Sequence, residues 1–167
     1  ITITITTTTT TTTTRVMTMT DMRNSIPMPY VVEQTSRGER TYDPQPYHPA
    51  LLAAKHKLED FTNVPFEVLF LNCYDGPRDH LGNHRDYSDS TRPIAIISLG
   101  AERDIWFTPQ SDVKDPSKRH VLKLQHGSLC LMLPGMQEEW FHRIPKASFE
   151  CGPRISGTWR GYEHPAG

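Results

Sequence analysis

The spacing of apolar residues changes near Phe66, where a helical pattern gives way to short β-type runs. Before that point, four apolar residues recur at helical spacing and form one stripe: Leu51, Ala54, Leu58 and Phe61. Pro49 suits the first turn of such a helix, and Thr62 with Asn63 suits its end. The sequence therefore predicts one amphipathic helix packed on the rest of the domain.

From Phe66 onward, short runs of β-branched, aromatic and apolar residues alternate with turn signals. The expected strands are residues 66–74, 93–99, 104–107, 120–124, 128–133, 139–143 and 155–160. Gly or Pro occurs in several of the segments between these strands, as at Gly76 and Gly127. Many short strands after one helix predict a mainly β domain with a flanking helix, built as a double-sheet jelly roll.

The amino-terminal part has a different character. Residues 1–14 contain only Ile and Thr, and such low complexity gives no unique packing register, so we expect disorder. Residues 15–43 are polar and turn-rich, without a clear period. Within them, residues 28–43 resemble the amino-terminal segment of the proteolytic subunit of Clp proteases. Nothing downstream resembles that protease or its nucleophilic serine, so we infer no protease activity.

Composition narrows the class of protein. The formal net charge is −1 with His neutral, which argues against a large non-specific polyanion binder but permits a local basic patch. Cys73, Cys130 and Cys151 show no C-x-x-C spacing, which argues against a disulfide scaffold or a structural zinc site. No apolar stretch approaches the ~20 residues of a membrane span, and no signal peptide is apparent. We expect a soluble protein, cytoplasmic or, in a eukaryote, nuclear.

The sharpest chemical signal is the triplet His84-Arg85-Asp86. Residues i and i+2 of a strand point to the same side, so one imidazole and one carboxylate can face a common ion. His142 could supply a second imidazole. Two His and one carboxylate form the facial triad that leaves open positions on non-haem Fe(II). Each of these residues taken alone is more often an ordinary structural residue.

A second group could hold a dicarboxylate co-substrate. Arg154 and Arg160 are six positions apart on one predicted strand, so alternation places both on the same face. Asn72 and Tyr74 are likewise two apart and share one side of their strand. A buried dicarboxylate needs cations and hydrogen-bond donors at both ends, and these four residues could supply them. A solvated strand face is the alternative for either Arg alone.

Residues from about 42 to 160 resemble the AlkB dioxygenases. The matching stretches are residues 66–74, 79–86, 93–100, 126–131 and 153–160, which contain all but one of the positions above. The resemblance implies a double-stranded β-helix core and iron ligands at His84, Asp86 and His142. It also implies that Asn72, Tyr74, Arg154, Arg160 and, in part, Ser156 hold 2-oxoglutarate, with Arg154 on its distal carboxylate.

The resemblance also implies a reaction. Fe(II), 2-oxoglutarate and O₂ would hydroxylate an N-alkyl carbon on a damaged DNA or RNA base, such as 1-methyladenine or 3-methylcytosine. Succinate and an aldehyde would be the other products. Residues 15–48 would then contain a nucleotide lid and residues 49–167 the catalytic domain, and we expect a monomer. The alternatives are an oxygenase of the same core acting on a protein or small molecule, and a catalytically impaired nucleic-acid-binding jelly roll.

Three departures from the family bear on the substrate. Ser156 occupies the place of an Asn that the family has between the two arginines of its last strand, and its hydroxyl is shorter. Tyr87 and Ser88 follow Asp86 where the family tends to have acidic residues, with Asp89 as a late substitute. Tyr87 could stack on a flipped base or pack on the lid. In the segment expected to form the lid, Tyr30 or Tyr42 could replace the usual stacking aromatic.

Overall fold

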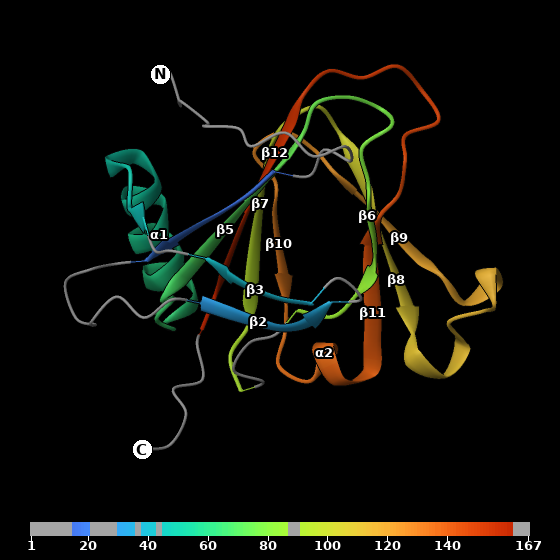
Figure 1. The fold of residues 1–167 in the computed structure, drawn as a ribbon, viewed down its shortest axis with the longest axis horizontal. Helices are drawn as coiled ribbons and strands as arrows, with labels where there is room; N and C mark the ends of the chain where they lie inside the picture. The colour runs from blue at the N-terminus through green and yellow to red at the C-terminus, as the bar shows by residue number, and fades with distance from the viewer. Residues whose placement is uncertain (1–14, 21–29, 36–37, 43–44, 87–90, 162–167) are drawn as a thin grey trace.

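The computed structural model describes residues 15–20, 30–35, 38–42, 45–86 and 91–161, and their side chains from Pro46 onward. In this part of the chain a six-stranded sheet packs on a four-stranded sheet, and a helix covers the outer face of the six-stranded sheet (Figure 1). Every pairing within the two sheets is antiparallel except that of β1 with β4. The predicted mainly β, jelly-roll architecture is confirmed.

The six-stranded sheet runs in the order β10 (Leu129–Met132), β7 (Ile94–Gly100), β12 (Arg154–Arg160), β5 (Val68–Tyr74), β1 (Arg15–Thr20) and β4 (Gln45–Pro46). The four-stranded sheet runs β6 (Leu81–His84), β11 (Trp140–Ile144), β8 (Arg103–Pro109) and β9 (His120–Leu124). A separate pair consists of β2 (Tyr30–Thr35) and β3 (Gly38–Tyr42). The helices are α1 (Pro49–Thr62), α2 (Met136–Glu139) and the 3₁₀ turns η1 (Gln110–Asp112) and η2 (Pro116–Lys118).

Strands β1, β2 and β3 lie in residues 15–43, a segment in which the sequence shows no clear period. The sequence of β1, Arg-Val-Met-Thr-Met-Thr, has strand-forming residues, but apolar and polar types alternate only over its last four positions. Its place is set by pairing with β5 rather than by its own pattern. The expected disorder of residues 1–14 lies outside the described residues.

Alternation along the strands produces two apolar layers. Between the sheets lies one core cluster: Tyr74, Ile94, Ile96, Ile105, Phe107, Leu124, Met132 and Ile144. Beneath α1 lies the second: Leu58, Phe66, Leu69, Leu71, Ala95 and Trp159. Because neighbours in sequence point to opposite faces, Ala95 packs under the helix while Ile94 and Ile96 face the other sheet. The inner face of the six-stranded sheet can therefore carry polar side chains at some positions while its outer face stays apolar beneath α1.

Helix α1 begins and ends where the sequence predicts, but its buried face differs at one end. His48 caps it through Nδ1, which accepts from the Ala50 amide, and Asn63 ends it in the left-handed conformation. Phe61 is 73% exposed, so its placement on the apolar stripe is wrong. Phe66, just after the turn, is 1% exposed and belongs to the same core cluster as Leu58, so the core at this end of the helix does not need Phe61.

This difference predicts unequal effects on stability. Leu58→Ala should lower the free energy of unfolding by about 2–5 kcal/mol, because it leaves a cavity beneath the helix. Phe61→Ala removes a larger side chain, yet it should change that free energy by less than about 1 kcal/mol, because the ring is in solvent. Urea unfolding followed by circular dichroism compares the two. Equal losses would contradict the packing described here.

Candidate metal and co-substrate site

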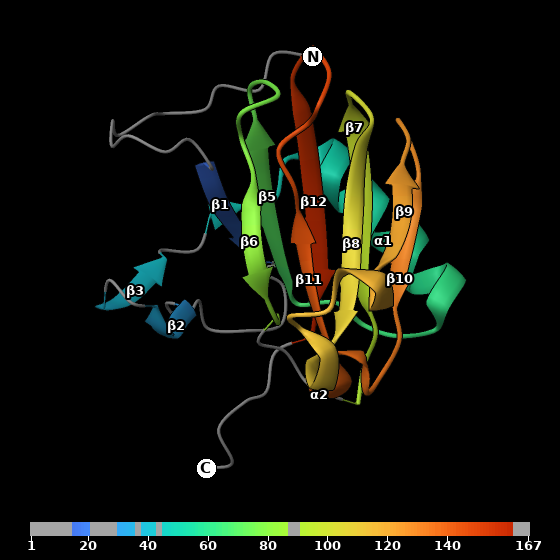
Figure 2. The ribbon, with the colours of Figure 1, turned by 90° about the vertical axis from the view of Figure 1, so that its right-hand side faces the viewer.

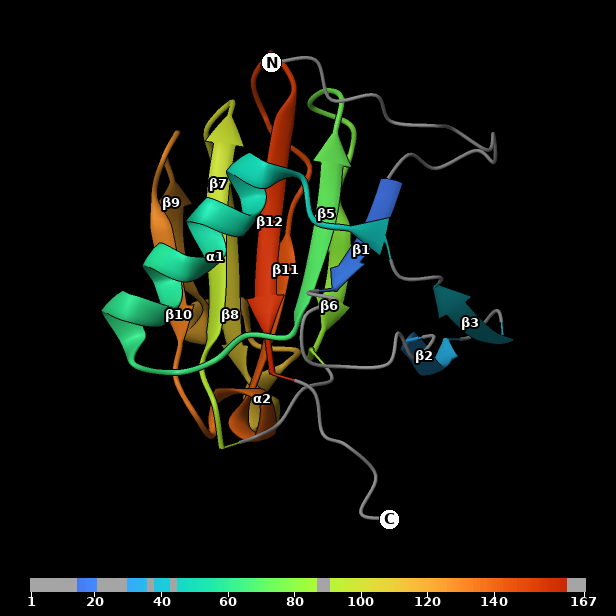
Figure 3. The ribbon, with the colours of Figure 1, turned by 90° about the vertical axis from the view of Figure 1, so that its left-hand side faces the viewer.

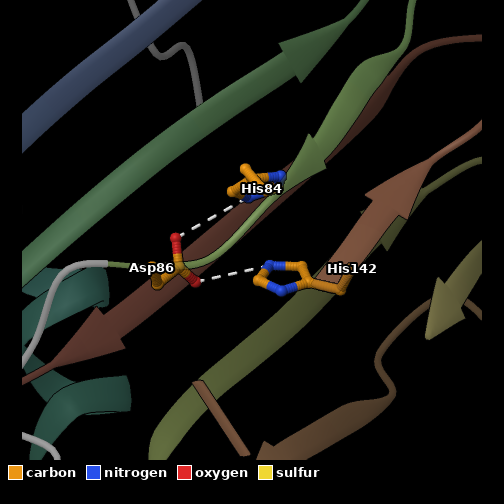
Figure 4. Close-up of side chains that lie close together, drawn as sticks. All are labelled: His84, Asp86 and His142. Carbon is orange, nitrogen blue, oxygen red and sulfur yellow. Dashed lines mark ion pairs between the residues drawn. The ribbon is translucent and has the colours of Figure 1, made fainter. Parts of the chain in front are cut away.

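Three side chains able to bind a metal meet where β6 ends beside β11. His84 is the last residue of β6 and the Cα partner of His142 in the middle of β11. Asp86 follows two residues later, and one ligand atom from each residue lies within 4.8 Å of the others. His84 Nε2 is 3.7 Å from Asp86 Oδ1, and His142 Nε2 is 3.5 Å from Asp86 Oδ2 (Figure 4). The sequence motif and the distant His thus converge on one point.

Neighbouring groups orient these three residues. His84 Nδ1 lies 2.8 Å from the carbonyl oxygen of Gly82, an arrangement in which Nδ1 carries the proton and Nε2 keeps its lone pair. The backbone N–H of Asp86 donates to Gln137 Oε1 of α2 at 2.7 Å. Gln137 therefore joins the segment that carries Asp86 to the short helix immediately before β11. Sequence analysis did not identify Gln137, because nothing in its local pattern indicates a partner 51 positions away.

Burial and nearby charges shift the pKa values of Asp86 and His84 toward the protonation states that bind a metal. Burial alone would raise the pKa of Asp86, but the Arg160 guanidinium and the two imidazoles hold it well below its ordinary value. Arg160 NH2 donates to Asp86 Oδ1 at 2.8 Å. Burial, with His142 close by, lowers the pKa of His84. At neutral pH the arrangement favours one carboxylate and a neutral His84, whose lone pair a divalent cation requires.

Arg154 lies on the inner face of β12 and is 1% exposed. Its NH2 donates to Ser98 Oγ at 2.8 Å and to Ser156 Oγ at 3.3 Å. Its Nε and NH1 have no hydrogen-bond partner among the described residues. A buried guanidinium with unused N–H groups is costly unless an anion completes it, and a carboxylate matches that geometry. Ser156 thus supports Arg154, although its hydroxyl is shorter than the Asn of the family.

Tyr74 lies between two guanidinium groups. The centre of its ring is 5.1 Å from Arg154 and 5.5 Å from Arg103. Burial raises the pKa of Tyr74, and the nearby Arg154 opposes that rise, so the phenol stays protonated and can donate at neutral pH. Arg103 itself donates to the carbonyl oxygens of Gly76, Asp79 and Pro145. Sequence analysis missed Arg103, since a charged residue at a strand start is usually solvated.

The structure brings most of the predicted site residues onto the two inner faces. Across the six-stranded sheet, Arg154 pairs in register with Tyr74, and Ser156 pairs with Asn72, which alternation places on the same face as Tyr74. Arg160, the last residue of β12, lies on the same face of that strand and donates a hydrogen bond to Asp86.

The predicted substrate residues are not tested. Tyr87 and Asp89 lie outside the described residues. Tyr30 and Tyr42 are Cα partners in the β2–β3 pair, but their side chains are outside the described part.

Residues 5–160 match the model of the 2OG-Fe(II) oxygenase superfamily. The chain belongs to this superfamily. Its members' Fe(II), 2-oxoglutarate and O₂ are therefore the cofactors to test against the site. The donor set of two imidazoles and one carboxylate suits Fe(II), and the unused N–H groups of Arg154 suit a carboxylate end of 2-oxoglutarate. The residues present fit both groups.

Individual relatives narrow the comparison and confirm the AlkB resemblance. The chain is 35% identical over 127 residues to the cattle DNA oxidative demethylase ALKBH2, covering 72% of this chain and 46% of that protein. It is 33% identical over 137 residues to cattle alpha-ketoglutarate-dependent dioxygenase alkB homolog 3, and the match covers 76% of this chain and 48% of that protein. The chain thus spans about half the length of these relatives.

A solved structure of OsALKBH1 has a similar fold. Its TM-score is 0.51 at 18% identity, and the match covers 76% of this chain and 72% of that one.

Proposed function

We propose that this chain uses Fe(II), 2-oxoglutarate and O₂ to remove alkyl groups oxidatively from bases of DNA or RNA. The observation that carries the proposal is the meeting of His84, Asp86 and His142 on inner faces that also hold the buried Arg154. The similarity to relatives named as a DNA oxidative demethylase and an alkB homolog supports a nucleic-acid substrate. Suitable bases are those with an N-alkyl group, such as 1-methyladenine and 3-methylcytosine.

Each residue has a role in this proposal. His84 and His142 would bind the metal through Nε2, and Asp86 through its carboxylate, while Arg160 keeps that carboxylate ionised. Arg154 would pair with the distal carboxylate of 2-oxoglutarate. Its hydrogen bonds to Ser98 and Ser156 would orient the guanidinium group for that contact. When bound, Fe(II) with 2-oxoglutarate and O₂ supplies the oxidation of the N-alkyl carbon, which then leaves as an aldehyde.

The remaining proposed contacts complete the pocket. Tyr74 would donate its phenol, and Asn72 its amide, to the same co-substrate. The apolar cluster between the sheets would keep bulk water from the reacting groups. For the substrate base, Tyr87, Asp89, Tyr30 and Tyr42 stay predictions. So do the division at residues 15–48 and 49–167, a monomeric state, and a cytoplasmic or nuclear location.

Product formation from a methylated oligonucleotide tests the proposal. The protein is supplied with Fe(II), 2-oxoglutarate, O₂ and single-stranded DNA or RNA carrying one 1-methyladenine. We expect succinate and formaldehyde in equal amounts, because each hydroxylated methyl group consumes one co-substrate. Succinate without formaldehyde would favour a protein or small molecule as substrate. Neither product from folded protein would favour a nucleic-acid-binding role without catalysis.

The proposal concerns a chain in which no described helix is long and apolar enough to cross a membrane.

A further inference from the structure

The outer faces of the two sheets differ in what covers them. Helix α1 lies across the outer face of the six-stranded sheet (Figure 3). Among the described residues, no helix lies across the outer face of the four-stranded sheet, where β6, β11, β8 and β9 stand side by side (Figure 2). Alternation places the neighbours of the metal-binding residues on this uncovered face, since Arg85 follows His84 and Phe141 precedes His142.

Arginine and aromatic side chains alternate along this face. We call this group the Arg–aromatic track: Arg85, Trp106, Arg119, Phe141 and Arg143. The guanidinium carbon of Arg119 lies 3.8 Å from the centre of the Trp106 ring, and that of Arg143 lies 5.0 Å from it. Arg85 lies 5.2 Å from the centre of the Phe141 ring. Arg143 and Trp106 are Cα partners across β11 and β8, so the contacts follow the sheet.

The track has more N–H donors than acceptors. Arg85, Arg119 and Arg143 have no carboxylate within ion-pair distance among the described residues, and only Arg85 has an amide acceptor, Gln110 Oε1 at 3.3 Å. Trp106 Nε1 and Arg143 Nε are both buried without a hydrogen-bond partner there. Stacking on the rings holds the guanidinium groups in place without neutralising them. An anion with several acceptor oxygens would pair with these guanidinium groups.

The Arg–aromatic track contains no acidic residue, and the acidic residues nearest to it in sequence have other neighbours. Asp104, on the same face of β8, is the Cα partner of Lys123, a cation. Asp112 accepts from Ser111, and Asp115 accepts from Ser117 in the turns between β8 and β9. The track itself carries three positive charges, those of Arg85, Arg119 and Arg143, although the whole chain has a formal net charge of −1. A local positive surface on a near-neutral protein is typical of a specific contact with a polyanion.

We propose that the Arg–aromatic track binds the phosphate backbone of the nucleic-acid strand that flanks the modified nucleotide. Guanidinium groups pair with phosphate oxygens through two N–H groups at once, and an Arg held flat on an aromatic ring presents its edge for that contact. Because Arg85 lies between His84 and Asp86, the track begins on the far side of the strand that carries the metal site. The inference rests on the proposed nucleic-acid substrate.

The test compares two double variants in binding to an unmodified, dye-labelled single-stranded oligonucleotide. Arg119→Gln/Arg143→Gln removes two track cations. Lys57→Gln/Arg78→Gln removes two exposed cations outside the track and serves as the control. Fluorescence anisotropy gives the dissociation constant across a salt series. Each lost phosphate contact should reduce the slope of log affinity against log salt by about 0.7, so the track variant should lose about 1.4.

The outcomes separate the track from the proposed function. A reduced slope in the track variant alone, with succinate formation in the absence of nucleic acid unchanged, supports the inference. A slope equal to that of the wild type or the control overturns it, as does a wild-type protein that binds no oligonucleotide. Absence of formaldehyde from methylated substrate overturns the proposed reaction instead. The anisotropy result does not depend on that reaction, because its oligonucleotide carries no alkyl group.

Discussion

Replacing His142 with Ala is expected to abolish iron-dependent succinate formation, and replacing Asp86 with Ala should do the same. His142 is 4% exposed and stands at the centre of β11, so no other described side chain can take its place beside His84. Changes to groups that merely orient a ligand typically cost 10–100-fold in affinity or activity, so loss of a ligand should cost on the order of 100-fold or more. Succinate formation and bound iron after desalting measure the effect.

His56→Ala is the matched control for these variants. His56 is an exposed His on α1, far from the inner faces, and its replacement should leave iron binding and succinate formation unchanged. Thermal unfolding of each variant shows whether it remains folded. Turnover that survives in folded His142→Ala or Asp86→Ala would remove that residue from the set of metal ligands.

The second large effect concerns the co-substrate. Arg154→Met should raise the KM for 2-oxoglutarate by about 10–100-fold, since a charge-assisted hydrogen-bonded contact to a carboxylate is worth about 1.5–3 kcal/mol. Met preserves much of the packing against Tyr74 that the Arg stem provides. Because Arg154 is not one of the proposed metal ligands, kcat at saturating co-substrate should fall far less than KM rises. Initial rates across a 2-oxoglutarate series give both constants.

A conservative variant distinguishes the proposed contact from a role in packing. Arg154→Lys retains the charge but cannot make two parallel hydrogen bonds to one carboxylate, so its KM should lie between those of wild type and Arg154→Met. A KM unchanged from wild type in Arg154→Met would exclude Arg154 from co-substrate binding. Equal loss of kcat in both variants, with no change in KM, would indicate a structural role alone.

Much of the fold follows from local patterns, and the errors have physical causes. Periodicity placed α1 and most strands near their observed positions, because each of those elements buries one face. It failed at Phe61, whose burial depends on where Phe66 packs after the turn. It did not identify β1, whose apolar-polar alternation covers only four residues and which pairs along its whole length with β5.

The site was predictable where the residue type itself carries the chemistry. His84 and Asp86 stand out as a short motif, and Arg154 as a cation on an otherwise buried strand. Gln137 and Arg103 do not, because each acts through backbone groups of distant segments: an amide at Asp86 for one, and carbonyls of Gly76, Asp79 and Pro145 for the other. Any amide or any cation could stand at such positions until the fold is known.

The pairing of β6 with β11 determines when during folding the metal cluster can form. His84 and Asp86 reach His142 only after β11, which comes late in the chain, has docked on β6, and contacts between distant segments are slow to form. A partly folded chain would have a helix and several strands, but would lack a place for the ion. Iron uptake during refolding should therefore lag behind the recovery of secondary structure, so bound metal would report that the chain has completed this long-range pairing.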